Sequence, residues 1–406
     1  RKPTGPERSN AVEQAAGFEK DDFEFIELVN LSSERIALTG SRLAKEEIDG
    51  ELEGVSFDFS NSSIQSLDPG ERVVVVETLD AFRARYGDGL PVAGEWRGAL
   101  SNNRETITLR SFSNELIQQF SYNDSGLWPA QADGEGATLV ANRFEGNLSA
   151  PESWGRSVRY LGSPGVVDVA PMGVVINEVL THTDPPLTPS DSIELMNTTS
   201  SAIDISGWYL SDSADNLLKF EVPVGTIIPP NAYVVFDESD FNPSPLSPLE
   251  HHFALSSARG DDVWLTIAEG ERPTVIADVV SFGATPNGES LGRVPNGSGP
   301  LQPMRERSLG TPNREVRVGP LVISELHYAP GEPSLESLAI EPTMTSDDLE
   351  FIELFNSTGF SVDLTNWRLR GGVDFDFDPG QRIAPGGSLV LIAFDPAKPE
   401  NASRLA

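Results

Sequence analysis

The sequence predicts an all-β protein made of tandem two-layer β-sandwich modules. Three observations support this prediction: one short motif occurs three times, its apolar and polar residues alternate, and turn-forming residues are spread along the chain. The motif is Ile-Glu-Leu-x-Asn, and its glutamates are Glu27, Glu194 and Glu353. The spacings between them, 167 (194 − 27) and 159 (353 − 194) residues, correspond to whole domains rather than to solenoid repeats.

Each copy of the motif predicts a half-buried β-strand that ends in a turn. The isoleucine and the leucine point to one side and the glutamate to the other, which is the two-residue period of a strand. The asparagine that closes each copy is a typical turn residue. The 36 glycines and 31 prolines are distributed rather than clustered, as expected for many strands joined by tight turns.

The order of the expected strands divides the chain into a tail and three modules. Residues 1–20 are polar and aperiodic, and they predict a loose tail or linker. The first module is expected at 21–168, the second at 169–318 and a partial third at 319–406. The third stops before the last strands of the common order, and the first lacks an opening strand. We therefore expect a piece of a longer polypeptide; the alternative is that another chain supplies the third module's missing strands.

Within the first module, the apolar run 72–77 predicts a core strand, and Pro69 and Gly70 form the turn before it. One or two helical turns are expected at 79–86. Alternating segments predict the remaining strands of this module at 55–59, 106–110 and 116–122.

The second and third modules repeat this order. Strands are predicted at 174–179, 193–195, 203–210, 219–222, 233–236, 262–267 and 276–282, and then at 321–326, 351–354, 362–369, 375–377 and 388–392. Trp208 and Trp367 occupy the same place in the two modules. We expect both rings to fill the space between two sheets, with a ligand platform as the alternative.

The composition argues against several classes of function. A formal net charge of −33 repels phosphate backbones and anionic lipids, so we expect no direct nucleic-acid binding. The sequence has no run of 18 apolar residues, which argues against a membrane span, and it opens without a signal peptide. The absence of cysteine excludes disulfides, cysteine-based zinc sites and a thiol nucleophile.

Six short motifs follow one another in the same order in the modules. They are Ile-Asn-Glu-Val, Ile-Glu-Leu-x-Asn, (Val/Ile)-Asp-(Leu/Ile)-x-x-Trp-x-Leu, Pro-Gly before an apolar strand, Leu-Ser-(Asn/Ser), and a closing Ser/Thr-Pro-Gly/Asn. This order resembles the lamin tail domain of bacterial surface and secreted proteins. The second module carries nearly all of it, whereas the first lacks the tryptophan. The resemblance covers roughly residues 21–406 and implies immunoglobulin-like β-sandwiches in an exported protein.

The residues that could carry chemistry form few patterns. The four histidines, His182, His251, His252 and His327, do not share the equal spacing that a repeated catalytic or metal role requires. The sequence has no nucleophile elbow, no phosphate-binding glycine loop and no His-Glu-x-x-His motif. We therefore expect no catalytic residue within this chain.

Two sets of carboxylates are candidates for a cation. Asp374, Asp376 and Asp378 would lie on one face of a strand and suit Ca²⁺, although a plain solvent face is the alternative that we favour. The other set pairs the glutamate of each first strand with the glutamate of the repeated motif: Glu178 with Glu194, and Glu325 with Glu353. If those strands are neighbours, each pair needs a cation, a shared proton, an arginine, or hydrogen bonds from loop backbone; we favour the last.

Three functions from different classes remain open. The first is a non-enzymatic structural or adhesive array of an exported or cell-surface protein, acting through protein partners or self-assembly. The second is the accessory region of a larger secreted enzyme, because relatives of this type can carry a CotH-like kinase, a nuclease or another hydrolase. The third is a glycan- or protein-binding module that uses loop aromatics such as Trp128, Trp154 and Tyr160.

Overall fold

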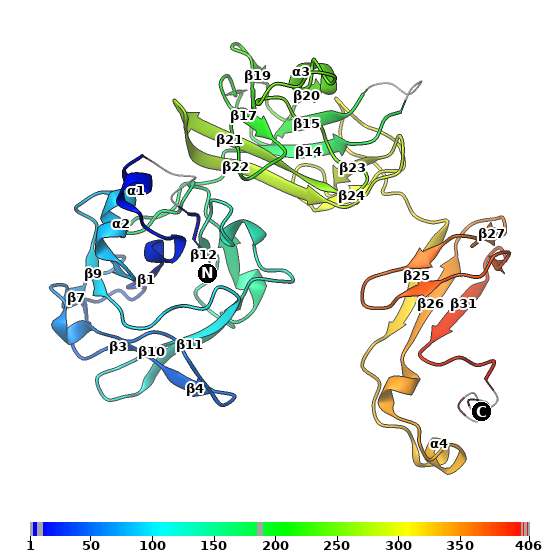
Figure 1. The fold of residues 1–406 in the computed structure, drawn as a ribbon, viewed down its shortest axis with the longest axis horizontal. Coiled ribbons are helices and arrows are strands. Elements are labelled where there is room, and N and C mark those ends of the chain that lie inside the picture. The colour runs from blue at the N-terminus through cyan, green and yellow to red at the C-terminus, as the bar shows by residue number, and fades with distance from the viewer. Residues whose placement is uncertain (1–2, 6–10, 185–189, 399–400, 402–403, 405–406) are drawn as a thin grey trace. The chain divides into compact units, whose positions relative to one another are not determined.

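The computed structural model describes residues 3–5, 11–184, 190–398, 401 and 404 (Figure 1). Strands dominate and helices are short, so the all-β prediction is confirmed. The chain forms two compact units, residues 1–314 and 315–406. The larger unit contains one hydrophobic core within the expected first module and another within the second, and the smaller unit has its own core. In the described part of the chain, no helix is long and apolar enough to cross a membrane.

The first module has two main sheets that face each other across a shared core. One has the order β1-β8-β9 and the other β11-β10-β3-β6. Their strands are β1 (Phe25–Val29), β8 (Arg72–Val76), β9 (Val92–Glu95), β3 (Arg42–Ala44), β6 (Phe57–Asp58), β10 (Arg104–Arg110) and β11 (Leu116–Asn123). Three small pairs complete it: β2 (Ile36–Ala37) with β7 (Ser66–Leu67), β4 (Glu46–Ile48) with β5 (Glu51–Glu53), and β12 (Leu139–Ala141) with β13 (Trp154–Arg156).

Short helices lie between these strands, and one of them explains the apolar run at 72–77. The helices are α1 (Ala11–Ala16), η2 (Lys20–Phe23), η3 (Phe59–Asn61), α2 (Leu79–Tyr86), η4 (Ala130–Ala132) and η5 (Pro151–Ser153). Val73 and Val75 of β8 face the core between the sheets, whereas Val74 and Val76 pack against Phe82 of α2. Because α2 covers the outer face of the strand, both faces of β8 are buried.

The expectation of a loose tail at residues 1–20 is wrong for the described residues. Thr4 is 3% exposed, and its hydroxyl accepts a hydrogen bond from the Gly136 N–H at 2.7 Å. Glu13 of α1 is fully buried, and its Oε2 accepts hydrogen bonds from Nε and Nη2 of Arg85 at 3.1 and 2.7 Å. The polar composition of this segment therefore serves specific buried contacts, which composition alone does not reveal.

The second module is the most complete. Its five-stranded sheet has the order β20-β15-β14-β23-β24 and its four-stranded sheet the order β18-β17-β21-β22. The elements are β14 (Val174–Leu180), β15 (Ser192–Asn197), β16 (Ile203–Asp204), β17 (Tyr209–Ser211), β18 (Phe220–Glu221), β19 (Ile227–Ile228), β20 (Tyr233–Asp237), α3 (Glu238–Phe241), β21 (Asp261–Glu269), β22 (Arg272–Phe282), β23 (Ser290–Arg293) and β24 (Leu301–Pro303). Ile176, Ile193, Leu210 and Leu265 are fully buried in the core between the two sheets.

The third module has one three-stranded sheet, β25-β26-β31, and two short strand pairs, β27-β30 and β28-β29. Its elements are β25 (Leu321–His327), α4 (Leu335–Ile340), η6 (Ser346–Leu349), β26 (Phe351–Asn356), β27 (Val362–Asp363), β28 (Arg368–Leu369), β29 (Phe375–Asp376), β30 (Arg382–Ile383) and β31 (Ser388–Ile392). Within the described residues, no counterpart of the β21–β22 hairpin covers this sheet. Its core is correspondingly small, with five buried residues.

The first two modules share a small apolar cluster of their own. Tyr160 and Leu161 from the end of the first module pack with Leu217, Trp264 and Ile276 of the second. The segment that follows β13 also pairs with β22, because the Ile276 N–H donates to the Val158 carbonyl at 2.8 Å. These contacts account for residues 1–314 behaving as one compact unit.

Candidate functional site

The asparagine that ends each repeated motif fastens one turn to another. Asn30, Asn197 and Asn356 are at most 2% exposed. In each case Nδ2 donates to the carbonyl four residues ahead, at 2.7–2.8 Å. It also donates to the carbonyl that ends the short strand before the partner strand. The Oδ1 atom accepts the N–H two residues ahead at 2.9 Å. The closing asparagine of the motif therefore has a structural role, because it holds the end of its own strand to the segment before the partner strand.

Glu178 and Glu194 lie directly opposite each other in the antiparallel pairing of β14 and β15. The register shifts between Ile176 and Glu178, so Asn177 is an extra, unpaired residue. Such a β-bulge breaks the alternation of sides and re-aims a side chain. The Asn177 Nδ2 donates to Glu194 Oε1 at 2.7 Å, and all three side chains are fully buried.

Neutral donors hold both carboxylates of this pair. Glu178 accepts hydrogen bonds from the hydroxyl of Ser290 and from the N–H and hydroxyl of Ser308, the last at 2.7 Å. The remaining oxygen of Glu194 accepts the Gly310 N–H. Ser308 and Gly310 belong to the loop that closes the module, so the carboxylates fasten that loop to the sheet, mainly through backbone and hydroxyl donors.

Burial changes the protonation of Glu194. Removal from water raises the pKa of Glu194 from 4.5 to about 7, and the negative charge of Glu178 adds to this rise. The hydrogen bonds from Asn177 and Gly310 oppose it, because they stabilise the ionised form. Glu194 therefore titrates near neutral pH in a fully buried setting.

The third module repeats this geometry in a more open setting. Glu325 lies opposite Glu353, and the register shift leaves Ser324 as the extra residue. The Ser324 hydroxyl donates to Glu353 Oε1 at 2.6 Å, as Asn177 does to Glu194. Glu325 and Ser324 are exposed here, whereas Glu178 and Asn177 are buried in the second module.

In the first module the motif glutamate has a different partner. Glu27 forms an ion pair with Arg72 of the neighbouring strand. Its second oxygen accepts the Gly165 N–H at 2.6 Å, again from the loop that ends the module. In both modules of the larger unit, the repeated glutamate therefore binds the closing loop.

Of the three carboxylates considered for calcium, Asp374, Asp376 and Asp378, two lie beside an arginine. Arg370 pairs with Asp376 and lies 4.0 Å from Asp374, so its guanidinium balances these carboxylates where a metal ion was considered. Only Phe375 and Asp376 of this stretch are in a strand. Nowhere in the described residues do three or more His, Cys, Asp or Glu side chains gather in a way that could hold a metal ion.

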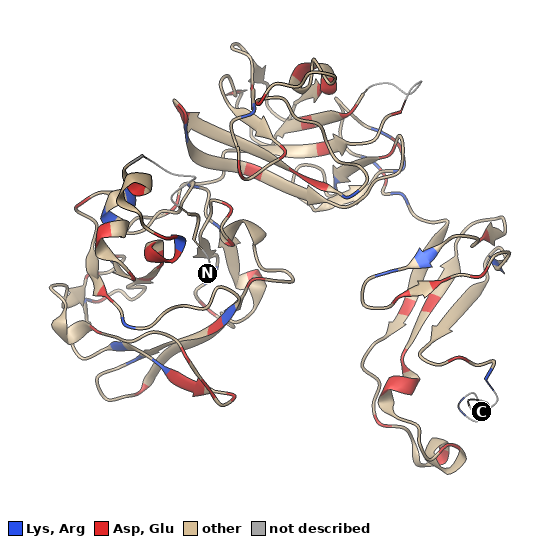
Figure 2. Cartoon of the chain, in the orientation of Figure 1, with Lys and Arg blue, Asp and Glu red and all other residues tan. Residues whose placement is uncertain are grey.

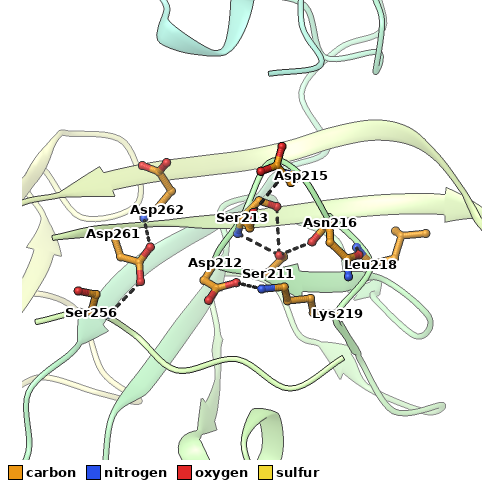
Figure 3. Close-up of polar contacts among 10 residues, drawn as sticks. All are labelled: Ser211, Asp212, Ser213, Asp215, Asn216, Leu218, Lys219, Ser256, Asp261 and Asp262. Atoms are coloured by element: carbon orange, nitrogen blue, oxygen red, sulfur yellow. Dashed lines mark hydrogen bonds and ion pairs between the residues drawn. The ribbon is translucent and has the colours of Figure 1, made fainter. Parts of the chain in front are cut away.

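A second acidic cluster, at the start of β21, is held by its own hydrogen bonds (Figure 3). Asp212 pairs with Lys219, and Asp261 accepts the N–H groups of Ser256 and Asp262 at 2.9 and 3.0 Å. Burial raises the pKa of Asp261, and the charges of Asp212 and Asp262 add to the rise. More widely, Figure 2 shows Asp and Glu residues along every module rather than in one patch.

The histidines do not meet in one place. His182 lies 3.4 Å from Asp184, and its Nδ1 contacts the Thr285 carbonyl. His251 and His252 stack edge to face on each other, and His327 packs against Phe351. None of these contacts places a histidine beside a nucleophile.

The aromatic residues correct two expectations. Trp208 is 8% exposed in the core of the second module, but Trp367 is 41% exposed, so the prediction of a buried ring is wrong there. Strands β21 and β22 extend the sheet that contains β17, and the described part of the third module has no such strands. The aromatic residues considered for glycan binding do not lie on open surface: Trp128 and Tyr160 are each 8% exposed, and Trp154 packs against the core of the first module.

The sequence did not reveal the bulge residues Asn177 and Ser324 as partners of the motif glutamates. The available signal was the repeated Ile-(Asn/Ser)-Glu, in which two polar residues in succession interrupt the alternation of a strand. At both positions the side chain donates a hydrogen bond to the motif glutamate of the neighbouring strand.

Comparison with known families gives one result. The model of the lamin tail domain matches residues 169–283 and 317–404, which together make up half of the chain. No curated protein matches the sequence. The two matched segments begin close to the expected starts of the second and third modules.

Proposed function

Because the chain belongs to the lamin tail domain family, we propose that it is a non-enzymatic array of structural modules that acts through protein–protein contact. Support comes from the repeated residues, since every copy of the motif asparagine and glutamate is engaged in holding strands or loops together. Such residues give a stable scaffold and leave no repeated group free for turnover.

One observation carries the proposal: in the described residues, the third module has an open sheet edge with apolar residues beside it. Ile323 and Leu326 of β25 are 57% and 56% exposed, whereas their counterparts Ile176 and Val179 are fully buried. In the second module, β14 pairs with β23 on its outer side. Among the described residues, no strand pairs with the outer side of β25.

An open edge of this kind favours the addition of a strand from another polypeptide. The exposed rings of Trp367 and Phe375, 41% and 37% exposed, add apolar surface to the same module. We propose that the added strand is β25 of a second copy, because two antiparallel β25 strands would form a self-complementary, two-fold contact.

Sedimentation velocity of the whole chain at physiological salt, over the micromolar range, tests this assembly. We expect a monomer–dimer equilibrium that Ile323→Lys and Leu326→Lys abolish, because a charge at an apolar contact is costly to bury. Val224→Lys is the matched control, since Val224 is 92% exposed in the second module. A chain that stays monomeric at every concentration, or equal association of all three variants, would contradict the proposal.

We further propose that the array works outside the cell, in an exported or surface-attached protein. The acidic composition supports this, because a surface of one charge stays soluble in salty surroundings. Fractionation of the source cells, followed by detection of the native protein with a specific antibody, provides the test. Recovery in the medium or at the cell surface is expected, and recovery confined to the cytoplasm would overturn the proposal.

A further inference from the structure

The second module contains two Asn-Gly pairs, and the structure holds them very differently. They are Asn287-Gly288, in the segment before β23, and Asn296-Gly297, in the segment after it. Both glycines have a positive φ, 78° and 74°, a conformation that glycine adopts without strain. Because glycine has no side chain to shield its backbone nitrogen, each pair has the local chemistry for deamidation of its asparagine.

Deamidation of an Asn-Gly pair needs only water as a co-reactant. The backbone nitrogen of the glycine attacks the side-chain carbonyl carbon of the asparagine, a C–N bond forms, and the amide leaves as ammonia with the proton that the nitrogen gives up. Water then opens the resulting five-membered imide ring at either carbonyl, which gives aspartate or isoaspartate. The attack requires the side chain to turn toward the nitrogen, so an asparagine fixed by hydrogen bonds reacts only when those bonds open.

Several hydrogen bonds fix Asn296. Its Nδ2 donates to the Tyr233 hydroxyl at 3.0 Å. Its Oδ1 accepts hydrogen bonds from Asn177 Nδ2 at 3.1 Å and from the Asn313 N–H at 2.9 Å. The attacking nitrogen is held as well, because the N–H of buried Gly297 donates to Asn177 Oδ1 at 2.9 Å. The bulge residue Asn177 therefore holds both reacting groups of this pair.

One hydrogen bond holds the side chain of Asn287, which is exposed. Its Oδ1 accepts the Asp184 N–H at 3.0 Å, and no described residue accepts a hydrogen bond from its Nδ2. The Gly288 N–H donates to the His182 carbonyl at 2.7 Å. Since the glycine nitrogen is hydrogen-bonded in both pairs, the difference between them lies in the freedom of the asparagine side chain.

We propose that Asn287 is a site of spontaneous deamidation, and that Asn177 protects Asn296 from the same reaction. The product places a second carboxylate beside Asp184, whose own carboxylate lies 3.4 Å from His182. The two negative charges repel each other, and isoaspartate also inserts an extra methylene into the backbone. Conversion therefore weakens the contact between the segment after β14 and the segment before β23. This inference does not depend on the proposed function.

Peptide mapping by mass spectrometry tests the site on the whole chain. The folded protein is incubated in mildly alkaline buffer, and conversion at Asn287 and Asn296 is followed with time. Asn287 should convert more than about tenfold faster than Asn296, because each additional hydrogen bond that must open lowers the reactive population. In urea, where the chain is unfolded, the two rates should become similar. Equal rates in the folded protein, or an Asn287 that converts only in urea, would overturn the proposal.

Matched variants separate the role of Asn177 from the stability of the module. Asn177→Ala should raise the rate at Asn296 toward its value in urea, because it frees the Gly297 N–H and removes one bond to Asn296. Trp208→Ala is the control, since it also weakens the second module but leaves these contacts in place. An equal rise in both variants would show that general stability, and not Asn177, protects Asn296. If Asn177→Ala does not fold, Asn177→Ser is the milder change, because serine occupies the equivalent position of β25. Asn287→Gln should abolish the rapid release of ammonia, and unchanged release would refute the assignment.

Discussion

Glu178 faces Glu194 across the pairing of β14 and β15, yet each buried carboxylate is held by its own set of neutral donors. The bulge residue Asn177, the first residue of β23 and the loop that closes the module supply these donors. The pair therefore joins three parts of the second module that are far apart in the sequence. Because the arrangement depends on complete hydrogen bonding, loss of any one donor should be costly.

Glu194→Gln should weaken the second module and change its response to pH. A glutamine amide offers only one oxygen to the two donors, Asn177 and Gly310, so we expect a loss of about 1–3 kcal/mol at pH 8. Burial raises the pKa of Glu194 to about 7, so the folded state binds a proton more tightly than the unfolded state does. The stability contribution of protonated Glu194 is therefore present below pH 4.5 and is lost as the pH rises to about 7.

Urea denaturation between pH 4 and 8 measures this effect as the difference between wild type and variant. The wild type should lose stability across this interval by a component that Glu194→Gln lacks. Parallel pH profiles for the two proteins would show that Glu194 does not titrate in this range.

Asn177→Ala should destabilise the chain far more than Ser324→Ala. The first change leaves Glu194 Oε1 and the Gly297 N–H without their partner in a buried setting, at a cost of about 2–4 kcal/mol. The second removes an exposed hydroxyl that donates to half-buried Glu353, and we expect less than about 1 kcal/mol. Equal losses in chemical denaturation would mean that burial does not decide the strength of this contact.

Trp208→Ala and Trp367→Ala form a second matched pair. Removal of the buried ring should cost about 3–5 kcal/mol, since it leaves a cavity in the core of the second module. Removal of the half-exposed Trp367 should cost much less. Thermal unfolding followed by tryptophan fluorescence measures both, and a large loss for Trp367→Ala would indicate that this ring is buried in solution.

Glu13→Ala should destabilise the first module although Glu13 precedes the first strand. Its removal leaves the buried Arg85 without a counter-ion, at a cost of about 3–5 kcal/mol. Asp88→Ala is the control, because the Arg83–Asp88 pair is exposed and such pairs contribute little. Guanidinium denaturation compares the two. Equal stability of Glu13→Ala and wild type would mean that the segment before residue 20 does not stabilise the module in solution.

Local patterns predicted much of the fold. The expected helical turns at 79–86 are α2 itself, and the strand expected at 72–77 is β8 with one residue fewer. The turn role of the motif asparagine was also visible, because asparagine often hydrogen-bonds to backbone near a strand end. These features depend on residues close together in the sequence.

Features that depend on distant partners were not predictable from local pattern. Trp208 and Trp367 follow the same local sequence, but among the described residues only the second module has strands that extend the sheet beside the ring. The burial of Glu13 depends on Arg85, which lies on a later helix. The alternating aspartates at 374–378 resemble a calcium ligand set in the sequence. Their pattern does not show that the Arg370 side chain folds back onto them.

The bulge residue in β14 fixes the register of that opening strand, and the equivalent residue in β25 does the same there. If the register of β14 shifted by two residues, the other side chains would still point to the same faces of the sheet. Asn177, however, would move away from Glu194, and a regular strand segment would lie where the bulge is now. Each opening strand can therefore pair with its neighbour in only one register. In a chain whose modules carry similar opening strands, this feature keeps a strand of one module from pairing in the wrong register within its neighbour.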